Sequence, residues 1–529
     1  MITITPQGQI YICKTPLEND YKNQLTFATK NTQKSYFNTK IQQTFDNYTY
    51  VKKDNVVKVG INIDKIIDCN YLFYENVGFT EEDNTLRTYY CFITNMEYIN
   101  ENCTAITFET DCFQTYYFDI VYKRCFVERE HVNDDTMGLH TIPEGLETGD
   151  YISCDLQPTS ETLGETCFVL ATTEQWTTSY SFTNQILPIG GYYVGFTTIQ
   201  GIQDAIEDLD NAGKGDSVFA VFVAPKEFFS AWGTISGVNG QVSTTVKFDY
   251  SKNVTVTHVD YLGNNYTPKN NKLKCFPYSY LQVSNHSGQV VNYKWENFNL
   301  LSVAGTTGYN FVIKGTLTPS GSFKCLPVNY NNILNNYDDN IVIGKLPIGA
   351  YNNDVYTNWL TQNGVNIGLN LLSSAVQIGA GVGAIASGAG AVGGAGTIGS
   401  GLMRIASTLG SVYEHSLIPD SVSGNVNTGD VNFTLGLQDP EFKRISIKNE
   451  YAKVIDDYFS MFGYKVNSVK IPNITGRTNW NFVKTIDCNF EGDIPQSDLN
   501  TIKDMFNKGV TLWHNPATMY DYSQNNSIS

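Results

Sequence analysis

The side chains in this sequence that could do chemistry are its histidines, its cysteines and its paired carboxylates. The six histidines are scattered along the chain, and none belongs to an HExxH string or to a close pair that would hold a metal ion. His131, in the string Arg129-Glu-His-Val132, has charged neighbours that could support acid–base catalysis. Because a single histidine beside Arg and Glu more often makes structural hydrogen bonds, we predict a structural role for His131.

The cysteines offer a second kind of chemistry. There are eleven of them, an odd number, and no CxxC string occurs. Disulfides or a metal site would explain them, but structural zinc requires closely paired ligands, and these residues are spread across the chain. A protein assembled in a bacterial cytoplasm would also keep its thiols reduced. We therefore predict that the cysteines are free and act as small buried hydrophobic residues.

Motifs for covalent or phosphate chemistry are missing from the sequence. It contains no Gly-x-Ser-x-Gly string and no Gly-x-x-x-x-Gly-Lys-Ser/Thr string. A glycosidase needs two carboxylates placed across a sugar, whereas the acidic pairs Glu81-Glu82 and Asp134-Asp135 resemble solvated turns. We predict that the chain is not an enzyme and that it uses no cofactor and no metal ion.

Length, composition and charge narrow the class further. A chain of 529 residues exceeds what one hydrophobic core supports, so we expect several domains. Aromatic residues make up 13% of the sequence, which favours pleated β structure. The net charge of −17 would repel phosphate, so nucleic acid is not expected as a bound ligand, although an acidic wall would let DNA pass. The N-terminus lacks the basic and apolar regions of a signal peptide.

The elements that must position these side chains are mostly strands. In the N-terminal part, alternation and close spacing predict strands at 56–63, 89–96, 105–110 and 116–122. Repeated short strands separated by turn residues are typical of a sandwich or barrel. The region that follows is also rich in β-forming residues. There, Thr198 can cap a helix, followed by a buried strand at 216–224, and the apolar face of the helix carries Ile202, Ile206 and Leu209.

The C-terminal part is predicted to be a compact α+β module. The expected strands are 441–447, 465–471 and 482–488. A helix over 451–462 would end at Gly463, and the residues on its apolar face would be Val454, Tyr458 and Met461. Ser497 can cap a last helix that ends at Gly509, and the residues on its apolar face would be Leu499, Ile502 and Phe506.

One long stretch differs from everything around it. From Val355 to Met403 the sequence has 49 consecutive residues without Asp, Glu, Lys, Arg or His, and the centre, 379–396, is dominated by Gly and Ala. Apolar residues recur at helical spacing on both sides of that centre. The pattern predicts two amphipathic helices that flank a flexible, apolar, glycine-rich tip.

The functional interpretation of this stretch is membrane insertion, and the alternative is a helical hairpin packed in an oligomer core. A permanent anchor is disfavoured, because polar residues interrupt the apolar run and each Gly weakens a helix by roughly 1 kcal/mol relative to Ala. A segment hidden in one state and inserted in another fits better, since small residues let helices approach closely in a bilayer. The predicted membrane-inserting residues are Ile367, Leu369, Leu371, Leu372, Val376, Ile378, Val382, Ile385, Val392, Ile398, Leu402, Met403, Ile405 and Leu409.

Several local strings resemble those of the tail-knob, or distal tail, proteins of small short-tailed phi29-like phages. The resemblance is specific over about residues 15–150 and 440–515, weak through 151–350, and one of character only in the Gly/Ala-rich stretch. The strings are Asn19-Asp-Tyr-Lys-Asn23, Asp111-Cys-Phe-Gln-Thr-Tyr116, Arg129-Glu-His-Val132, Glu144-Gly-Leu146, Phe462-Gly-Tyr-Lys-Val-Asn467, Lys470-Ile-Pro-Asn473, Asn481-Phe-Val-Lys-Thr485, Gly492-Asp-Ile494 and Gly509-Val-Thr-Leu-Trp-His514.

This resemblance implies a hollow homohexameric tube at the distal end of a phage tail, and therefore a place in the virion. The two matching parts would together form a tube wall on a β-sandwich or barrel theme. The Gly/Ala-rich loop would plug the lumen before infection and then enter the host membrane, opening a path for the genome. The implied partners are other copies of the chain, neighbouring tail and collar proteins, the host membrane, and transiting double-stranded DNA bound without sequence specificity.

The predicted fold is mainly β with some α. Its regions are an N-terminal tube-wall β domain (1–150), an inserted knob region (151–350), a hydrophobic membrane-active loop (351–412) and a C-terminal α+β part that completes the wall (413–529). A receptor- or cell-wall-glycan-binding tail protein, with 151–350 as the recognition module, is the first alternative. A cell-wall hydrolase is less favoured, because no acid–base pair can be identified, and a pore-forming toxin would normally carry a secretion signal.

Overall fold

The chain divides into two compact units. The first comprises Met1–Gly149, Thr267–Leu273 and Asn449–Ser529, and the second comprises Asp150–Tyr266 and Lys274–Lys448. The computed structural model describes residues 8–48, 55–77, 86–158, 163–176, 191–257, 259–286, 288–299, 301–303, 306–318, 323–328, 330–331, 341–343, 348–350 and 439–529. The predicted membrane-active loop, 351–412, lies outside the described residues.

The first unit contains an antiparallel six-stranded sheet in the order β3-β1-β5-β6-β7-β4. Its strands are β1 (Gly8–Cys13), β3 (Ile41–Tyr48), β4 (Val56–Val59), β5 (Tyr71–Val77), β6 (Leu86–Asn100) and β7 (Cys103–Thr110). Helix α1 (Lys30–Asn38) begins with a capping box between Thr29 and Thr32, which satisfies the backbone amides of these two residues. The helix packs Phe37 against the rings of Tyr71 and Tyr90 on the sheet.

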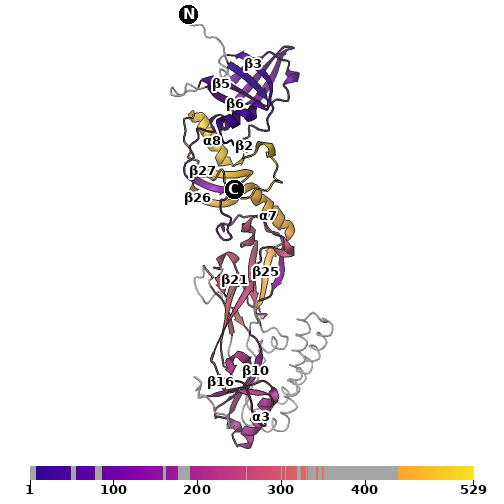
Figure 1. Cartoon of the computed structure of the whole chain (residues 1–529), viewed down its shortest axis with the longest axis vertical. Helices are drawn as coiled ribbons and strands as arrows, with labels where there is room; N and C mark the ends of the chain where they lie inside the picture. The colour runs from indigo at the N-terminus through magenta and orange to yellow at the C-terminus, as the bar shows by residue number, and fades with distance from the viewer. Residues whose placement is uncertain are drawn as a thin grey trace, which may run out of the picture. The chain divides into compact units, whose positions relative to one another are not determined.

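A second sheet of the first unit is built from both ends of the chain. Its order is β2-β28-β27-β8-β26, and its strands are β2 (Asn23–Leu25), β8 (Cys125–Glu130), β26 (Tyr464–Lys470), β27 (Trp480–Ile486) and β28 (Val510–Trp513). Strand β2 pairs in parallel with β28, and β8 lies between β27 and β26, so a purple ribbon runs between two orange ones in Figure 1. Three further helices belong to the unit: α2 (Cys112–Tyr116), α7 (Asn449–Phe462) and α8 (Gln496–Lys508). The N- and C-terminal parts therefore share one core.

The second unit is also built mainly of strands. One sheet has the order β14-β15-β11-β10-β12-β24, and helix α3 (Ile199–Asn211) packs against β10 and β11. The second has the order β17-β21-β22-β23, with β20 beside β21, and the third has the order β19-β18-β25-β9. Strands β13 and β16 form a separate pair. The strand bounds are β9 (Tyr151–Leu156), β10 (Thr166–Thr172), β11 (Tyr192–Phe196), β12 (Val218–Pro225), β13 (Phe229–Ser230), β14 (Gly233–Thr234), β15 (Gln241–Ser243), β16 (Thr245–Val246), β17 (Asp249–Thr257), β18 (Ser279–Ser284), β19 (Val290–Tyr293), β20 (Leu301–Val303), β21 (Thr306–Thr316), β22 (Phe323–Pro327), β23 (Ile341–Ile343), β24 (Ile348–Ala350) and β25 (Glu441–Ile447).

The prediction of a mainly β chain with a few helices is confirmed. The predicted helix after Thr198 is present as α3, and the Thr198 side chain accepts a hydrogen bond from the amide of Gly201. The predicted strand 441–447 is β25. The division of the chain into four predicted regions stays a prediction, and it did not include the return of Thr267–Leu273 to the first unit.

Three local predictions are wrong. Residues 116–122 do not form a strand, because the side chain of Asp111 caps helix α2, which ends at Tyr116 and is followed by turns. Strand β4 ends at Val59 and does not reach residue 63. Helix α8 begins at Gln496 after Pro495, so Ser497 lies inside its first turn and is not the cap.

Helix α7 buries a different face from the predicted one. Val454, which was expected in the core, is 70% exposed. The buried residues are Ala452, Ile455, Asp456 and Phe459. The physical reason is Asp456, a buried carboxylate whose hydrogen bonds are made inside the unit; hydrophobic periodicity assigns an aspartate to the solvent side and so rotates the predicted face.

Candidate functional site

A buried ionic cluster lies in the first unit around Glu144, whose side chain has no solvent exposure. Its carboxylate pairs with the guanidinium of Arg129 and with the ammonium of Lys272, and it accepts a hydrogen bond from the amide of Lys465 at 3.0 Å. Arg129 also donates to the carbonyl of Gly463 at 2.7 Å. Burying charge is tolerated when the charges are paired and hydrogen-bonded, and this cluster meets that condition.

The returning segment Thr267–Leu273 is held by two more carboxylates. The buried Asp456 of α7 accepts hydrogen bonds from the backbone amides of Lys269 and Asn270, at 2.8 and 3.0 Å. Asp135 accepts from the amide of Asn271 at 3.0 Å and from the hydroxyl of Tyr464 at 2.6 Å. The expectation that Asp134-Asp135 form a solvated turn is therefore wrong for Asp135, which is half-buried and bonded inside the unit.

His131 is locked by backbone groups on both ring nitrogens. Its Nδ1 accepts a hydrogen bond from the amide of Phe482 at 2.7 Å, and its Nε2 donates to the carbonyl of Ser460 at 3.1 Å. Burial, reinforced by the positive charge of Arg477, lowers the pKa of His131 to about 3, so the ring is neutral near pH 7. With both nitrogens occupied, the ring is not placed to transfer protons, and the predicted structural role is confirmed.

Asp111 shows the opposite shift. It is fully buried and caps helix α2 by accepting from the amide of Gln114 at 3.1 Å, and it also accepts from the hydroxyl of Tyr71 at 2.9 Å. Burial raises the pKa of Asp111 to about 7, although the hydrogen bonds it accepts act in the other direction. A perturbed carboxyl can mark a functional site, but this one is sealed in the core and acts as a helix cap.

Many of the strings that carry the family resemblance meet in this unit. Arg129-Glu-His-Val132, Glu144 and Phe462-Gly-Tyr-Lys-Val-Asn467 supply the ionic cluster described above. In the string Lys470-Ile-Pro-Asn473, the ammonium of Lys470 pairs with Glu130, and the amide of Asn473 donates to the same carboxylate at 2.8 Å. These polar residues therefore join distant segments of the chain to one another. The role that these contacts support is structural: they hold the N-terminal and C-terminal parts of the chain together.

The cysteines and the remaining acidic residues give no sign of a metal centre. The eleven cysteines all lie in described segments and none forms a disulfide; nine of them are buried, as the predicted role as small buried residues requires. Across the described segments, no group of three or more His, Cys, Asp or Glu residues is close enough to hold a metal ion.

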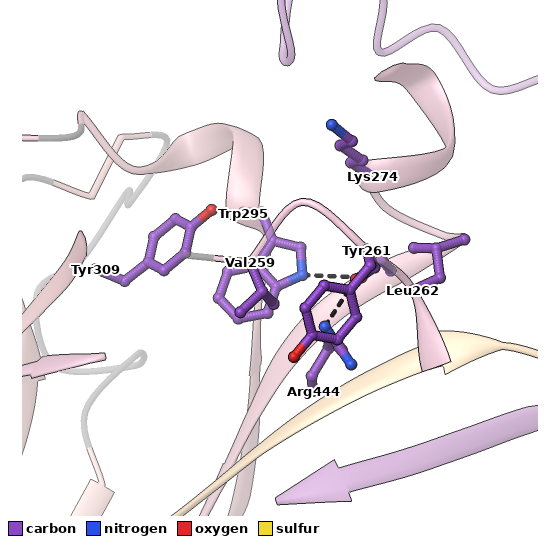
Figure 2. A pocket seen from close by; sticks show the side chains of 8 residues that line it. Val259, Tyr261, Leu262, Lys274, Trp295, Tyr309 and Arg444 are labelled. Atoms are coloured by element: carbon purple, nitrogen blue, oxygen red, sulfur yellow. Dashed lines mark hydrogen bonds between the residues drawn. The ribbon is translucent and has the colours of Figure 1, made fainter. Parts of the chain in front are cut away.

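A small pocket opens in the second unit. Figure 2 shows the residues that line it, and seven of the eight are labelled there: Val259, Tyr261, Leu262, Lys274, Ser279, Trp295, Tyr309 and Arg444. Its cavity volume is about 10 Å³, roughly the room that a single water molecule needs and far below that of pockets that hold organic ligands. Arg444 comes from strand β25, whose neighbours β18 and β9 fix its position. Sequence reasoning missed this pocket; the available signal was an arginine on the same face of β25 as the buried Phe442 and Ser446.

The predicted membrane-inserting residues, from Ile367 to Leu409, all lie outside the described residues, so their insertion stays a prediction. Among the helices that the structure describes, none is both long enough and apolar enough to span a bilayer.

Comparison with known proteins first defines the class. Residues 9–123, which include the six-stranded sheet of the first unit, match the family profile described as the N-terminus of caudoviral major tail proteins. The solved structure of the tail knob protein gp12 of bacteriophage C1 has the same fold, with a TM-score of 0.63 over 99% of this chain and 100% of that one at 15% sequence identity. The chain thus has the fold of a phage tail protein.

The family follows from the rest of the chain. Residues 241–527 match the profile of the C-terminal domain of tail knob protein gp9 from Bacillus phage phi29. The chain is 24% identical to that phi29 protein, with 97% of both chains covered, and 23% identical to tail knob protein gp9 of Bacillus phage PZA, with 94% of this chain and 95% of the relative covered. The chain belongs to the phi29 gp9 family of tail knob proteins and is a component of the virion tail.

Proposed function

We propose that the chain assembles into a homohexameric ring whose hollow centre conducts the genome out of the virion. The observation that carries this proposal is the second sheet of the first unit, in which β8 is paired on one side with β27 and on the other with β26. A sheet that contains strands from both ends of the chain leaves most of the middle of the sequence, apart from Thr267–Leu273, free to form an inserted region. The tail fold and the family support the same arrangement.

The Gly/Ala-rich loop is proposed to plug this lumen and then to enter the host membrane. The support is its sequence: 49 residues without a charge, in a chain of net charge −17, form a segment that is costly to expose to water. Dense small residues would allow several copies of the loop to associate closely within a bilayer. The sequence resemblance supports the same role.

Liposome dye leakage tests the membrane step. The full chain is compared, from acid to neutral pH, with a variant in which Leu369–Leu409 is replaced by a Gly/Ser linker of equal length. Leakage by the full chain and none by the variant would support the proposal. A finer variant, Val382→Asp, places one charge in the loop and should reduce leakage, because a carboxylate at the bilayer centre costs roughly 2.5–3.5 kcal/mol on insertion scales. Its matched control is Val454→Asp, at an exposed position of α7.

Leakage that persists without the loop would contradict its assignment. Leakage by neither protein would leave a packed hairpin or a passive plug as the better interpretation. Mass photometry of the purified full chain tests the ring separately, since a homohexamer and a monomer differ widely in mass. The proposal of a ring and the proposal of a membrane-active loop can therefore be refuted separately.

The chain is also proposed to be non-enzymatic. The support is that its relatives are named for a structural part of the tail, and that the buried carboxylates Glu144 and Glu130 are occupied by partners within the first unit. Zymography on host cell walls checks this proposal, and a cleared zone that depends on an acidic residue of this chain would overturn it. A receptor- or glycan-binding role for 151–350 stays an alternative, and host-range changes mapping to that segment would favour it.

A further inference from the structure

The outer face of the sheet β19-β18-β25-β9 in the second unit carries aromatic side chains at the surface. Tyr151 of β9 is 39% exposed, and Phe276, which precedes β18, is 42% exposed. The opposite face of this sheet is the buried one, where Phe442 packs on Phe311 of β21 with ring centroids 5.2 Å apart. A cluster of large rings on the solvent side of a sheet, with polar residues around it, marks a candidate binding surface.

The strand register brings two of these rings together. Ser153 of β9 is opposite Ile445 of β25, and Ile445 is opposite Tyr280 of β18. Because alternate residues of a strand share a face, Tyr151 lies on the same face as Ser153. Strands β9 and β18 are two strand spacings apart, roughly 10 Å, yet the ring centroids of Tyr151 and Tyr280 are 6.2 Å apart. The two rings therefore lean toward each other over β25, which agrees with the 8% exposure of Ile445.

Phe276 extends the cluster, and the backbone around it is held in place. The ring centroid of Phe276 is 5.8 Å from that of Tyr280. The backbone amide of Phe276 donates to both carboxylate oxygens of Glu296 at 3.2 Å, and the hydroxyl of Tyr151 donates to the carbonyl of Pro277 at 3.2 Å. Rings that are fixed before a ligand arrives lose little conformational freedom when it binds.

The polar side chains beside the rings include two amides and two engaged lysines. Gln282 of β18 donates to the side-chain oxygen of Asn292 of β19 at 3.2 Å, and each amide has further donors and acceptors that this bond does not use. Lys443 of β25 pairs with Glu441 at 2.7 Å, and the ammonium of Lys294 lies 4.8 Å from the ring centroid of Phe276. The face therefore combines apolar rings with neutral hydrogen-bonding groups.

We propose that this face, the rings of Tyr151, Tyr280 and Phe276 with the amides of Gln282 and Asn292, binds a neutral glycan chain. One side of a sugar ring presents C–H groups, which pack well on an aromatic face because that face carries partial negative charge. The hydroxyl groups at the edge of the sugar require both donors and acceptors, and amides supply both. The proposal gives the glycan-binding alternative a defined surface, and it depends neither on the ring nor on the membrane-active loop.

Charge and area favour a neutral glycan over other occupants. A polyanion is disfavoured, because the chain carries a net charge of −17 and would repel it. A second copy of the chain is disfavoured by area. Tyr151 and Phe276 are 39% and 42% exposed, and an aromatic side chain has roughly 200 Å² in total. These rings therefore offer far less than the area of about 800 Å² that each partner buries in a stable protein interface.

Isothermal titration calorimetry and saturation-transfer NMR of the full-length protein test the proposal. The probes are neutral hexasaccharides of β-linked glucose, β-linked N-acetylglucosamine and rhamnose, with polyglycerol phosphate as the anionic comparison. At least one hexasaccharide should bind, and saturation of aromatic protons should pass to the C–H protons of the sugar. Tyr280→Ala should weaken binding about five- to hundredfold, the usual range for removing a ring that stacks on a ligand. Tyr280→Phe keeps the ring and should bind about as tightly as the wild type.

Tyr98→Ala is the matched control, because Tyr98 is 53% exposed on β6 of the first unit and should not affect binding. Phe276→Ala removes a ring outside the strands and keeps the test decisive if Tyr280→Ala fails to fold. Binding of none of the hexasaccharides, or equal weakening by Tyr98→Ala, would overturn the proposal. Binding of polyglycerol phosphate alone would overturn it in favour of an anionic polymer. Unchanged sugar binding by Tyr280→Ala with a smaller assembly mass would overturn it in favour of a contact between copies.

Discussion

Lys272 and Glu144 are 128 positions apart in the sequence, yet their side chains form an ion pair that is 4% and 0% exposed. Lys272 belongs to Thr267–Leu273, a short segment that interrupts the sequence of the second unit and forms part of the first. The same carboxylate pairs with Arg129, so one acid compensates two cations. The first unit is therefore assembled from three separate stretches of sequence, and its polar core depends on the shortest of them.

Replacing Glu144 by Gln should strongly destabilise the first unit. Arg129 and Lys272 would remain buried without their carboxylate, and breaking a buried ion pair by removing one partner costs about 3–5 kcal/mol. Differential scanning calorimetry of the full chain should show an early transition, and limited proteolysis should cut the first unit faster.

The matched control is Asp457→Asn. Asp457 pairs with Lys269 of the same returning segment at 3.3 Å, but both side chains are more than half exposed, 52% and 68%. An exposed pair contributes about 0–1 kcal/mol, so this variant should behave almost like the wild type. Equal effects of the two substitutions would show that burial of the Glu144 cluster has no energetic consequence.

Histidine 131 should make the first unit lose stability in acid. Its folded-state pKa is lowered to about 3, below the ordinary value of 6.5. Between these values the unfolded chain binds a proton and the folded chain does not, so its contribution is complete above pH 6.5 and is lost as the pH falls toward 3. His131→Gln should flatten the dependence of Tm on pH over this interval. An unchanged slope in His131→Gln would contradict the assignment.

Asp111 should act with the opposite sign. Its folded-state pKa is raised to about 7 from 3.8, so the folded chain keeps a proton that the unfolded chain releases. Its contribution to stability is complete below pH 3.8 and is lost as the pH rises through 7. Asp111→Asn imitates the protonated carboxyl and can still accept from the amide of Gln114. It should be more stable than the wild type at pH 8 and not at pH 4, as Tm measurements at both values would show.

The features that local sequence decides were predictable. Thr198 followed by Ile202 and Leu209 specifies the cap and face of α3, and the alternation from Glu441 to Ile447 specifies β25. These signals depend on residues within a few positions of one another. The same holds for the burial of the cysteines, since scattered thiols are most often small buried residues.

The features that depend on distant partners could not be predicted. Nothing near Lys272 in the sequence indicates that it pairs with Glu144, and a lysine is ordinarily assigned to the surface. The burial of Arg444 could not be predicted either, because it depends on Tyr261 and on the neighbouring strands β18 and β9. Hydrophobic periodicity mispredicts the burial of such residues, because it assigns every charged residue to the solvent-exposed face.

Helix α7 allows this failure to be tested at two adjacent positions. Periodicity predicted that Val454 is in the core and left Ile455 outside the predicted apolar face, whereas the structure has Val454 70% exposed and Ile455 5% exposed. Ile455→Ala should therefore cost about 2–5 kcal/mol, the usual range for truncating a buried aliphatic side chain. Val454→Ala should stay within about 0.5 kcal/mol, as for surface substitutions. Chemical denaturation of both variants, followed by the fluorescence of the buried Trp480 and Trp513, measures the difference. The reverse order would restore the predicted face and remove Asp456 from the core.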